Sequence, residues 1–328
     1  MASDGNGGPG PEPGVKAPPT MSRPRLAALD SFRGLTIAAM IIVNTPGSGQ
    51  HVWWPLDHAE WHGFTPTDLV FPAFLCAMGM ALGLSFPRAI DARLWRRVAW
   101  RVFALIALGW AWQMLARPSI EMFRVFGVLP RLGLCFGLAA VVGANHMWRA
   151  GRDAAGNVVY DPEGLFSTLP ATANVLFGLL AAAAWQRAPA RATSRIALAG
   201  VALVLLGLAL APHFPINKKL WTSSYVLLTT GLSALLFAGI VLAARSGAVC
   251  RALRPFDIFG MNAILAYLVS LLIGLAGMRL GFQAAGFAAI DGVLHAPRLA
   301  SFLYAVAVLL MVLALLIPLH RRGIHLRL

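Results

Sequence analysis

The residues best suited to chemistry lie in one segment between two long apolar stretches near the N-terminus. This segment, HVWWPLDHAEWHGFTPTD at residues 51–68, contains His51, His58, His62 and three tryptophans, and it ends at Asp68. An imidazole with an ordinary pKa of about 6.5 exchanges protons near neutral pH, as a general base must. The indole rings could form an apolar wall that excludes water from such a base.

Composition alone leaves three interpretations of this segment open. In the first, its tryptophans lie at headgroup depth as an aromatic belt, beside solvated histidines. In the second, His58 and His62, four residues apart, bind a metal. The sequence HAEWH, however, places its glutamate one position later than the HExxH motif, away from a metal-bound water. In the third, a single histidine is a catalytic base at the mouth of a membrane tunnel.

The elements that must position this segment are transmembrane helices. Of the 328 residues, 58% are hydrophobic and 12% are charged, whereas a soluble domain carries roughly 25% charged residues. These values exclude a soluble enzyme with one ordinary core, and they exclude a disordered chain. The formal net charge of +14 comes mainly from arginines clustered between apolar stretches. That is the positive-inside pattern of a membrane protein, so we expect no nucleic-acid partner.

The sequence predicts an all-α fold, a polytopic integral membrane bundle of about nine or ten transmembrane helices. Residues 1–22 are rich in glycine and proline and are expected to form a disordered tail, and residues 23–328 the membrane domain. Segment 281–296 is apolar but short, which predicts an interfacial or re-entrant helix. Gly79 and Gly83 form a GxxxG pattern, which predicts close helix packing. The nine predicted spans are 29–46, 65–86, 97–116, 125–146, 168–186, 195–212, 221–244, 257–278 and 299–319.

The distribution of arginines orients these spans. The N-terminal flank, the cluster at 88–101 and residues 187–195 are expected on the cytoplasmic side, and residues 214–220 on the opposite side. Both ends of the chain are then cytoplasmic, which nine spans cannot satisfy. The conflict falls between residues 149 and 195. Two successive basic loops there are both expected on the cytoplasmic side, although a single span separates them.

Several longer blocks of sequence resemble a known family. These are LDSFRG followed after nine residues by NTPG, then LDHAEWHGFTPTDLVFPAFLCAMG, FRVFGVLPRLGLCFGLAA, YDPEGLFSTLPA, FPINKKLWTSSYVL and FGMNAILAYLVS. In their wording and order they resemble the transmembrane N-acetyltransferases related to heparan-α-glucosaminide acetyltransferase, including its bacterial relatives. The resemblance extends over residues 25–328.

This resemblance implies an enzyme that moves an acyl group across a membrane. Acyl-CoA, with acetyl-CoA expected, would bind on the cytoplasmic side, and an amino sugar or cell-envelope glycan would accept the group on the far side. The implied location is a bacterial inner membrane, with a homodimer left open and no metal required. The alternative is a non-catalytic channel or carrier that uses the same polar tunnel.

The resemblance also assigns roles to individual residues. His58 corresponds to the family's active histidine, Asn44 to an asparagine that assists it, and Asp68 to the partner of the imidazole. The Asn44 amide could stabilise the oxyanion of acyl transfer. His62 stands where relatives often have asparagine and is not expected to be the base. The residues expected to bind CoA are Arg33, Arg131, Lys218, Lys219, Trp221 and Asn262.

Two departures from the family pattern affect these expectations. Pro130 precedes Arg131 where relatives commonly have glutamine, and proline can kink a helix, so the role of Arg131 is in question. Relatives also carry another spanning helix before the DPEGL block, where this chain has only the short polar stretch RAGRDAAGNVVYD. This missing crossing falls where the arginine pattern conflicts with nine spans.

Overall fold

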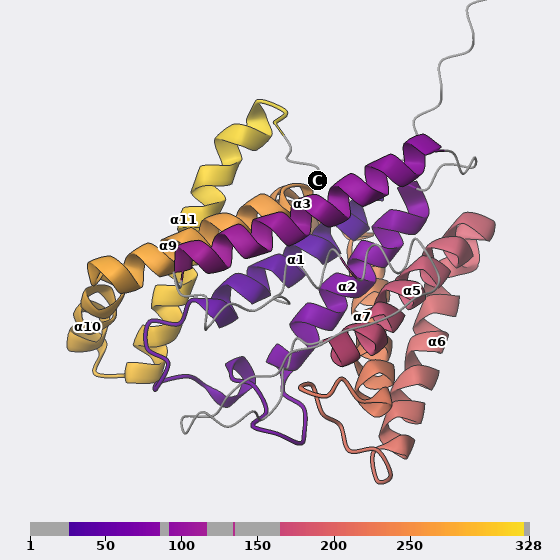
Figure 1. Ribbon diagram of the computed structural model, residues 1–328, viewed down its shortest axis with the longest axis horizontal. Coiled ribbons are helices and arrows are strands. Elements are labelled where there is room, and N and C mark those ends of the chain that lie inside the picture. Colours follow the sequence, from indigo (N-terminus) through magenta and orange to yellow (C-terminus); the bar gives the residue numbers. More distant parts are fainter. Residues whose placement is uncertain (1–25, 86–91, 117–133, 135–164, 325–328) are drawn as a thin grey trace, which may run out of the picture.

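Helices make up every regular element in the part of the chain described by the computed structural model, namely residues 26–85, 92–116, 134 and 165–324 (Figure 1). Eight of these helices are long and apolar enough to cross a membrane, which confirms the predicted polytopic all-α fold. The spanning helices are α1 (Ala27–Asn44), α2 (Pro66–Ser85), α3 (Ala92–Ala116), α5 (Leu165–Arg187), α6 (Pro189–Leu210), α7 (Ser223–Ala243), α9 (Ala263–Leu280) and α11 (Pro297–Arg321).

Three shorter helices complete the described part of the chain: η1 (Trp54–Leu56), α8 (Gly247–Met261) and α10 (Phe282–Leu294). The apolar helix α10 occupies the segment in which a short helix was predicted. The span predicted at 125–146 lies outside the described residues, apart from Leu134, and so does the tail predicted at 1–22.

Helix α1 connects two ends of the bundle that differ in construction. At one end, which we call the His58 end, α1 stops, α2 begins, and the loop between them meets the α6–α7 loop through Gly63 N–H, which donates to the carbonyl of Ile216 at 2.9 Å. Both loops lie at the bottom of Figure 1. At the other end, which we call the Arg33 end, α1 begins and α2 stops, close to the end of α5, where Gln186 Nε2 donates to the carbonyl of Gly83 at 2.9 Å.

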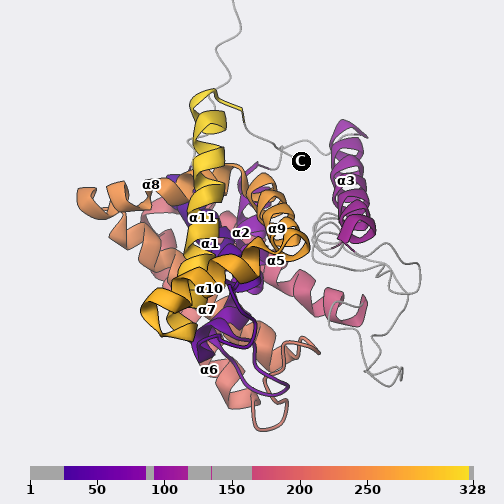
Figure 2. The same ribbon diagram turned by 90° about the vertical axis from the view of Figure 1, so that its left-hand side faces the viewer.

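The described spans alternate between these two ends. Helix α3 lies at one side of the bundle (Figure 2), and its last turn reaches the His58 end, where Arg279 at the end of α9 donates to the carbonyl of Leu115 at 2.8 Å. Helix α11 starts at the His58 end, where Gly47 N–H donates to the carbonyl of Ser301 at 3.1 Å. The eight described spans therefore begin and end at the Arg33 end. The described arginines of the cluster at 88–101 and of residues 187–195 lie toward this end, at the start of α3 and around the junction of α5 and α6.

Glycines allow the closest helix contacts. A Cβ atom at Gly79 would lie 2.0 Å from the carbonyl oxygen of Val175, and one at Gly83 would lie 2.7 Å from the Cβ of Ala182. Both distances are far below van der Waals contact, so only glycine fits. The close packing predicted from the GxxxG pattern is therefore confirmed, and α5 runs parallel to α2 in this contact.

The span predicted at 257–278 is wrong in its first residues. Helix α8 continues to Met261, and the helical conformation is interrupted at Asn262 before α9 begins at Ala263. The reason is that α8 carries charged side chains, including the exposed Arg251 and Arg254, and lies at the Arg33 end of the bundle. It packs across α1 so tightly that a Cβ atom at Gly260 would lie 1.9 Å from the backbone oxygen of Asp30.

Candidate active site

The start of α2 holds the carboxylate around which the site is built. Proline at the first helical position favours helix initiation, and Thr65 precedes it in the order Thr-Pro-Thr-Asp. Asp68 Oδ2 accepts hydrogen bonds from the backbone N–H groups of Thr65, at 3.1 Å, and Ala59, at 3.3 Å. The N–H of Thr65 and the Asp68 side chain thus form half of a capping box. The Asp68 side chain is fully buried, beside the positive end of the helix dipole.

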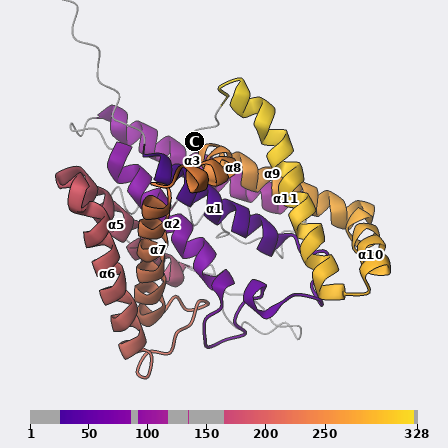
Figure 3. The same ribbon diagram turned by 180° about the vertical axis from the view of Figure 1, so that it is seen from behind.

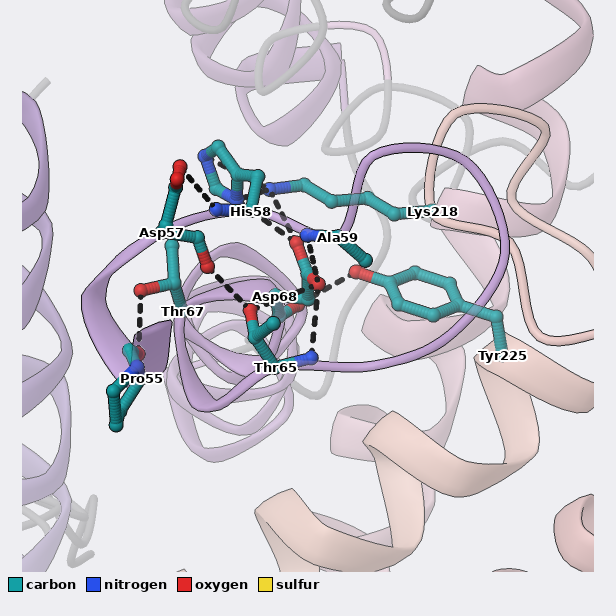
Figure 4. A network of polar contacts seen from close by, with 9 residues as sticks. All are labelled: Pro55, Asp57, His58, Ala59, Thr65, Thr67, Asp68, Lys218 and Tyr225. Carbon is teal, nitrogen blue, oxygen red and sulfur yellow. Dashed lines mark hydrogen bonds and ion pairs between the residues drawn. The ribbon is translucent and has the colours of Figure 1, made fainter. Parts of the chain in front are cut away.

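His58 lies directly against this carboxylate. Its Nδ1 is 2.8 Å from Asp68 Oδ1, and the ring is 49% exposed (Figure 4). Because an ionised carboxylate can only accept hydrogen bonds, this contact requires a proton on Nδ1. The lone pair of the neutral ring is then on Nε2. Asp68 therefore fixes both the orientation and the tautomer of a partly exposed imidazole.

Lys218 joins this pair from a distant part of the sequence. Its Nζ lies 3.3 Å from Asp68 Oδ1, 2.9 Å from His58 Nδ1 and 3.3 Å from His58 Nε2. The ammonium group cannot donate to Nδ1 while Nδ1 donates to the carboxylate, so its acceptors in that arrangement are Asp68 Oδ1 and the lone pair of His58 Nε2, each at 3.3 Å. The result is a compact group of one buried anion, one imidazole and one cation that lies close to both ring nitrogens.

The loop that carries Lys218 is anchored from behind by Trp221. This residue has a positive φ of 54°, which is strained for a bulky side chain, and it is 2% exposed. Its indole Nε1 donates to Asn174 Oδ1 at 3.1 Å, and its ring packs edge-on against Phe71 and Tyr225. The Tyr225 hydroxyl in turn donates to the backbone carbonyl of Asp68 at 2.6 Å. A CoA-binding role was predicted for Trp221, which lies buried behind the site.

The other residues predicted from the sequence do not join this group. Asn44 is exposed at the end of α1, and between the described side chains of Asn44 and His58 there is no hydrogen bond. Lys219 is on the same loop as Lys218, with its Nζ 5.5 Å from the centre of the Trp61 ring.

The residues predicted to bind CoA are divided between the two ends of the bundle. Arg33 contacts Asp30 Oδ1 at 2.9 Å and the carbonyl of Gly260, and Asn262 is buried at the junction of α8 and α9. At a rise of 1.5 Å per residue, Arg33 and Asn44 are about 16 Å apart along α1. Arg33 and Lys218 therefore cannot contact the same phosphate group. Arg131 lies outside the described residues.

No group of three or more histidine, cysteine, aspartate or glutamate residues that could hold a metal ion occurs within the described ranges. His62 is exposed, and its ring meets that of Trp61 at a centroid distance of 6.1 Å.

Three residues that support the site were not singled out from the sequence. Thr65 could have been found, because threonine three residues before an acid is a signature of a helix start. Asn174 could also have been suspected, because an amide inside a transmembrane span is costly and therefore usually has a purpose. Nothing in the sequence distinguishes Tyr225 from other aromatic residues at a helix start.

Comparisons with known proteins relate the N-terminal part of this chain to one family. Residues 25–151 match the family model for heparan-alpha-glucosaminide N-acetyltransferase, catalytic. The chain is 37% identical over 131 residues to heparan-alpha-glucosaminide N-acetyltransferase of Homo sapiens and 35% identical over 130 residues to that of Mus musculus. Each alignment covers 36% of this chain and 19% of the relative, so the chain spans about a fifth of the curated relatives it matches. His58 and Asp68 lie inside the matched segment, and Lys218 lies outside it.

Proposed function

We propose that this protein is a membrane-embedded acetyltransferase, because its residues 25–151 match the family model for heparan-alpha-glucosaminide N-acetyltransferase, catalytic, and are similar to curated N-acetyltransferases. It transfers an acetyl group from acetyl-CoA to an amino sugar, free or part of a cell-envelope glycan. One observation carries the proposal: a partly exposed imidazole is held at 2.8 Å by a buried carboxylate at the start of α2. This is the orientation that a general base requires.

In the proposed reaction, the acceptor amine attacks the carbonyl carbon of the thioester. His58 Nε2 takes the proton that the amine loses, while Asp68 stabilises the imidazolium that forms. The carbon–sulfur bond then breaks, and the imidazolium returns the proton to the departing sulfur of CoA. The products are the acetylated amine and free CoA, and His58 regains its neutral form.

Lys218 contributes a fixed positive charge to this scheme. Its Nζ lies 3.3 Å from His58 Nε2, so it is close to the point where negative charge develops, first on the carbonyl oxygen and then on the sulfur. This proposed role replaces that of a phosphate ligand. Asn44, at the end of α1, is the proposed second donor to the oxyanion once substrate is bound.

The donor is proposed to enter from the Arg33 end, with its thioester directed toward His58. That end carries the exposed arginines of α8, Arg251 and Arg254, whose guanidinium groups suit phosphates. Arg33 and Asn262 lie on the same side and remain proposed contacts of CoA. We further propose a bacterial inner membrane as the location, with the Arg33 end in the cytoplasm, and we leave a homodimer open.

The test is direct synthesis by the purified full-length protein in lipid nanodiscs. Isotope-labelled acetyl-CoA and glucosamine are supplied, and mass spectrometry identifies the product. We expect N-acetylglucosamine that carries the label, together with free CoA. A carrier or channel would yield neither, and that result would overturn the proposal.

The same preparation distinguishes direct transfer from a covalent intermediate on His58. Without acceptor, an acyl-histidine mechanism leaves labelled acetyl on a peptide that contains His58, whereas direct transfer leaves none. Asp68→Asn is the companion variant, because it keeps the shape of the side chain but removes its charge. It should slow either mechanism by about 100-fold if the carboxylate stabilises the imidazolium.

A further inference from the structure

The side-chain amide of Asn174 lies inside a spanning helix and takes part in no step of the reaction described so far. Asn174 belongs to α5 and is fully buried, and a polar group at such a depth is costly unless its hydrogen bonds are made. Its oxygen accepts from the indole of Trp221 at 3.1 Å, while its nitrogen donates to Thr230 Oγ1 at 2.8 Å and to Thr229 Oγ1 at 3.4 Å. The amide therefore connects α5 to α7 and to the loop from which α7 starts (Figure 3).

The loop before α7 brings Trp221 into direct contact with the backbone of Lys218. The N–H of Trp221 donates to the carbonyl of Lys218 at 3.2 Å, which closes a turn formed by residues 218–221. Lys218 is the first residue of this turn, and its ammonium lies 3.3 Å from Asp68 Oδ1. A shift of Trp221 therefore moves the residue that carries the cation of the site.

The turn at residues 218–221 does not keep its shape by its own preference. Trp221 has a φ of 54°, a conformation that a bulky side chain rarely adopts. Asn217, directly before the turn, is fully buried, and its Nδ2 has no hydrogen-bond partner among the described residues. Both features cost free energy, and they persist only where the surrounding structure imposes them. The contacts around Trp221 can impose this turn.

The hydrogen bond to Asn174 fixes the orientation of the Trp221 indole. The indole ring also packs edge-on against Phe71, at a centroid distance of 5.8 Å, and against Tyr225, at 5.2 Å. The burial of apolar surface is non-directional, whereas an N–H···O hydrogen bond requires alignment of its three atoms. A buried indole N–H that loses its acceptor is also costly, so the ring would move to find another. Without Asn174, the turn therefore loses the contact that orients it.

We propose that Asn174 is a positioning residue for the cation of the site. Through the indole of Trp221 it holds the turn at residues 218–221, and the turn keeps the ammonium of Lys218 against the imidazole and its carboxylate. The inference rests on the proposed acetyltransferase function and adds to it a residue that influences turnover from inside the membrane without contacting substrate. The alternative is that Asn174 only joins α5 to α7 through Thr230.

The first test follows the environment of Lys218 and needs no turnover. The chain contains only three lysines, Lys16, Lys218 and Lys219. The full-length protein in nanodiscs is reductively methylated with deuterated formaldehyde, and fragment-ion mass spectrometry gives the rate at each lysine. Lys218 should react at least ~10-fold more slowly than Lys219, because its ammonium pairs with a buried carboxylate. Asn174→Leu, which is close in volume but cannot accept the indole N–H, should make the two rates nearly equal.

The matched control is Thr230→Val, which removes the hydrogen bond from Asn174 to Thr230 and leaves the indole its acceptor. It should keep the native difference between the two lysines. Trp221→Phe removes the indole N–H without any change to α5, and it should abolish the difference as Asn174→Leu does. The thermal melting temperature identifies a variant that fails to fold, and if Asn174→Leu does so, Trp221→Phe carries the test.

The second test asks whether Asn174 acts through Lys218. Asn174→Leu and Lys218→Met should each reduce turnover by up to about 10-fold, the effect expected for one fixed charge. The double variant should lose no more than Lys218→Met alone, because both changes remove the same contact. A role confined to the packing of α5 against α7 would instead make the two losses multiply.

Four results would overturn the inference. They are equal methylation rates of the two lysines in the native protein, a native difference that persists in folded Asn174→Leu or Trp221→Phe, loss of that difference in Thr230→Val, and losses of turnover that multiply. Failure of the proposed function looks different, because the methylation rates would then follow the expected pattern while even the native protein forms no acetylated product.

Discussion

The two ends of α1 are held in place by different means. At the Arg33 end, helix backbones touch directly: a Cβ atom at Gly34 would lie 1.7 Å from the carbonyl oxygen of Phe256 on α8. At the His58 end, loops carry the functional side chains, and they are fastened by hydrogen bonds that the Asp68 carboxylate accepts and that the Thr65 and Tyr225 hydroxyls donate. The comparison indicates that backbone packing fixes the frame at one end, and that polar side chains shape the chemistry at the other.

The largest expected effect is an all-or-none difference in labelling between the two ends. In a variant whose native cysteines are replaced by alanine, cysteine is introduced at Ala190, at the Arg33 end, or at Pro215, at the His58 end. Both positions are exposed in the structure. A membrane-impermeant maleimide added to intact cells should label position 215 and not position 190. Labelling of both positions from outside would contradict the alternation of the described spans, and labelling of position 190 alone would contradict the proposed cytoplasmic location of the Arg33 end.

The next largest effect tests the direct backbone contact at the Arg33 end. Gly34→Ala forces α1 and α8 apart, because the new methyl group would overlap a backbone oxygen. Overpacking of this kind costs typically up to about 3 kcal/mol, so the thermal melting temperature in detergent should fall clearly.

The matched control for this substitution is Gly239→Ala on α7, where an added Cβ atom meets nothing within 4 Å. Its melting temperature should stay at the native value or rise, because alanine favours a helix over glycine. Equal melting temperatures for the two variants would mean that α1 and α8 do not touch as described.

At the His58 end, the largest effect should be on turnover and not on stability. His58→Ala should reduce acetyl transfer at least ~100-fold, the loss expected for a general base. The ring is 49% exposed and buries little apolar surface, so the melting temperature should remain unchanged. His62→Ala is the control, because His62 is exposed and does not contact Asp68. Equal loss in the two variants would favour the two-histidine metal site over the proposed base.

The smallest expected effect is that of Lys218→Met, which keeps the length of the side chain and removes its charge. Turnover should fall by about 10-fold, since one fixed charge near the developing oxyanion is lost while His58 and Asp68 keep their contact. Lys219→Met separates this effect from the general charge of the loop, because the Lys219 ammonium lies over Trp61. Should both variants lose the same activity, Lys218 has no special role in the site.

The sequence predicted the membrane fold because apolar length is a local property of the chain. It also predicted that Asp68 serves the imidazole of His58, and the structure brings these two side chains to 2.8 Å, although their roles await the experiments above. Such a pairing can be predicted because the two residues are close in the sequence: they are ten residues apart, and Asp68 lies in the first turn of the helix that follows His58.

The contact of Lys218 could not be predicted in the same way. It is 160 residues from His58 in the sequence, and its position depends on how the α6–α7 pair packs against α2 and α5. The sequence suggested a phosphate ligand because the lysine ammonium is a point charge that suits phosphate. The break at Asn262 was missed for a related reason: the last residues of α8, from Ile258 to Met261, are apolar and directly precede α9, and the packing of α8 on α1 depends on the folded bundle.

The distance in sequence between His58 and Lys218 also has a consequence for biogenesis. At ribosomal rates of roughly 5–20 residues per second, Lys218 is synthesised on the order of ten seconds after His58 and Asp68. During this interval α1 and α2 can enter the membrane, but the cation, the Trp221 anchor and the Tyr225 hydroxyl do not yet exist. The nascent chain therefore carries its carboxylate through insertion with its partners His58, Ala59 and Thr65 already present but without the Lys218 cation, and the proposed active site is completed when α7 joins the bundle.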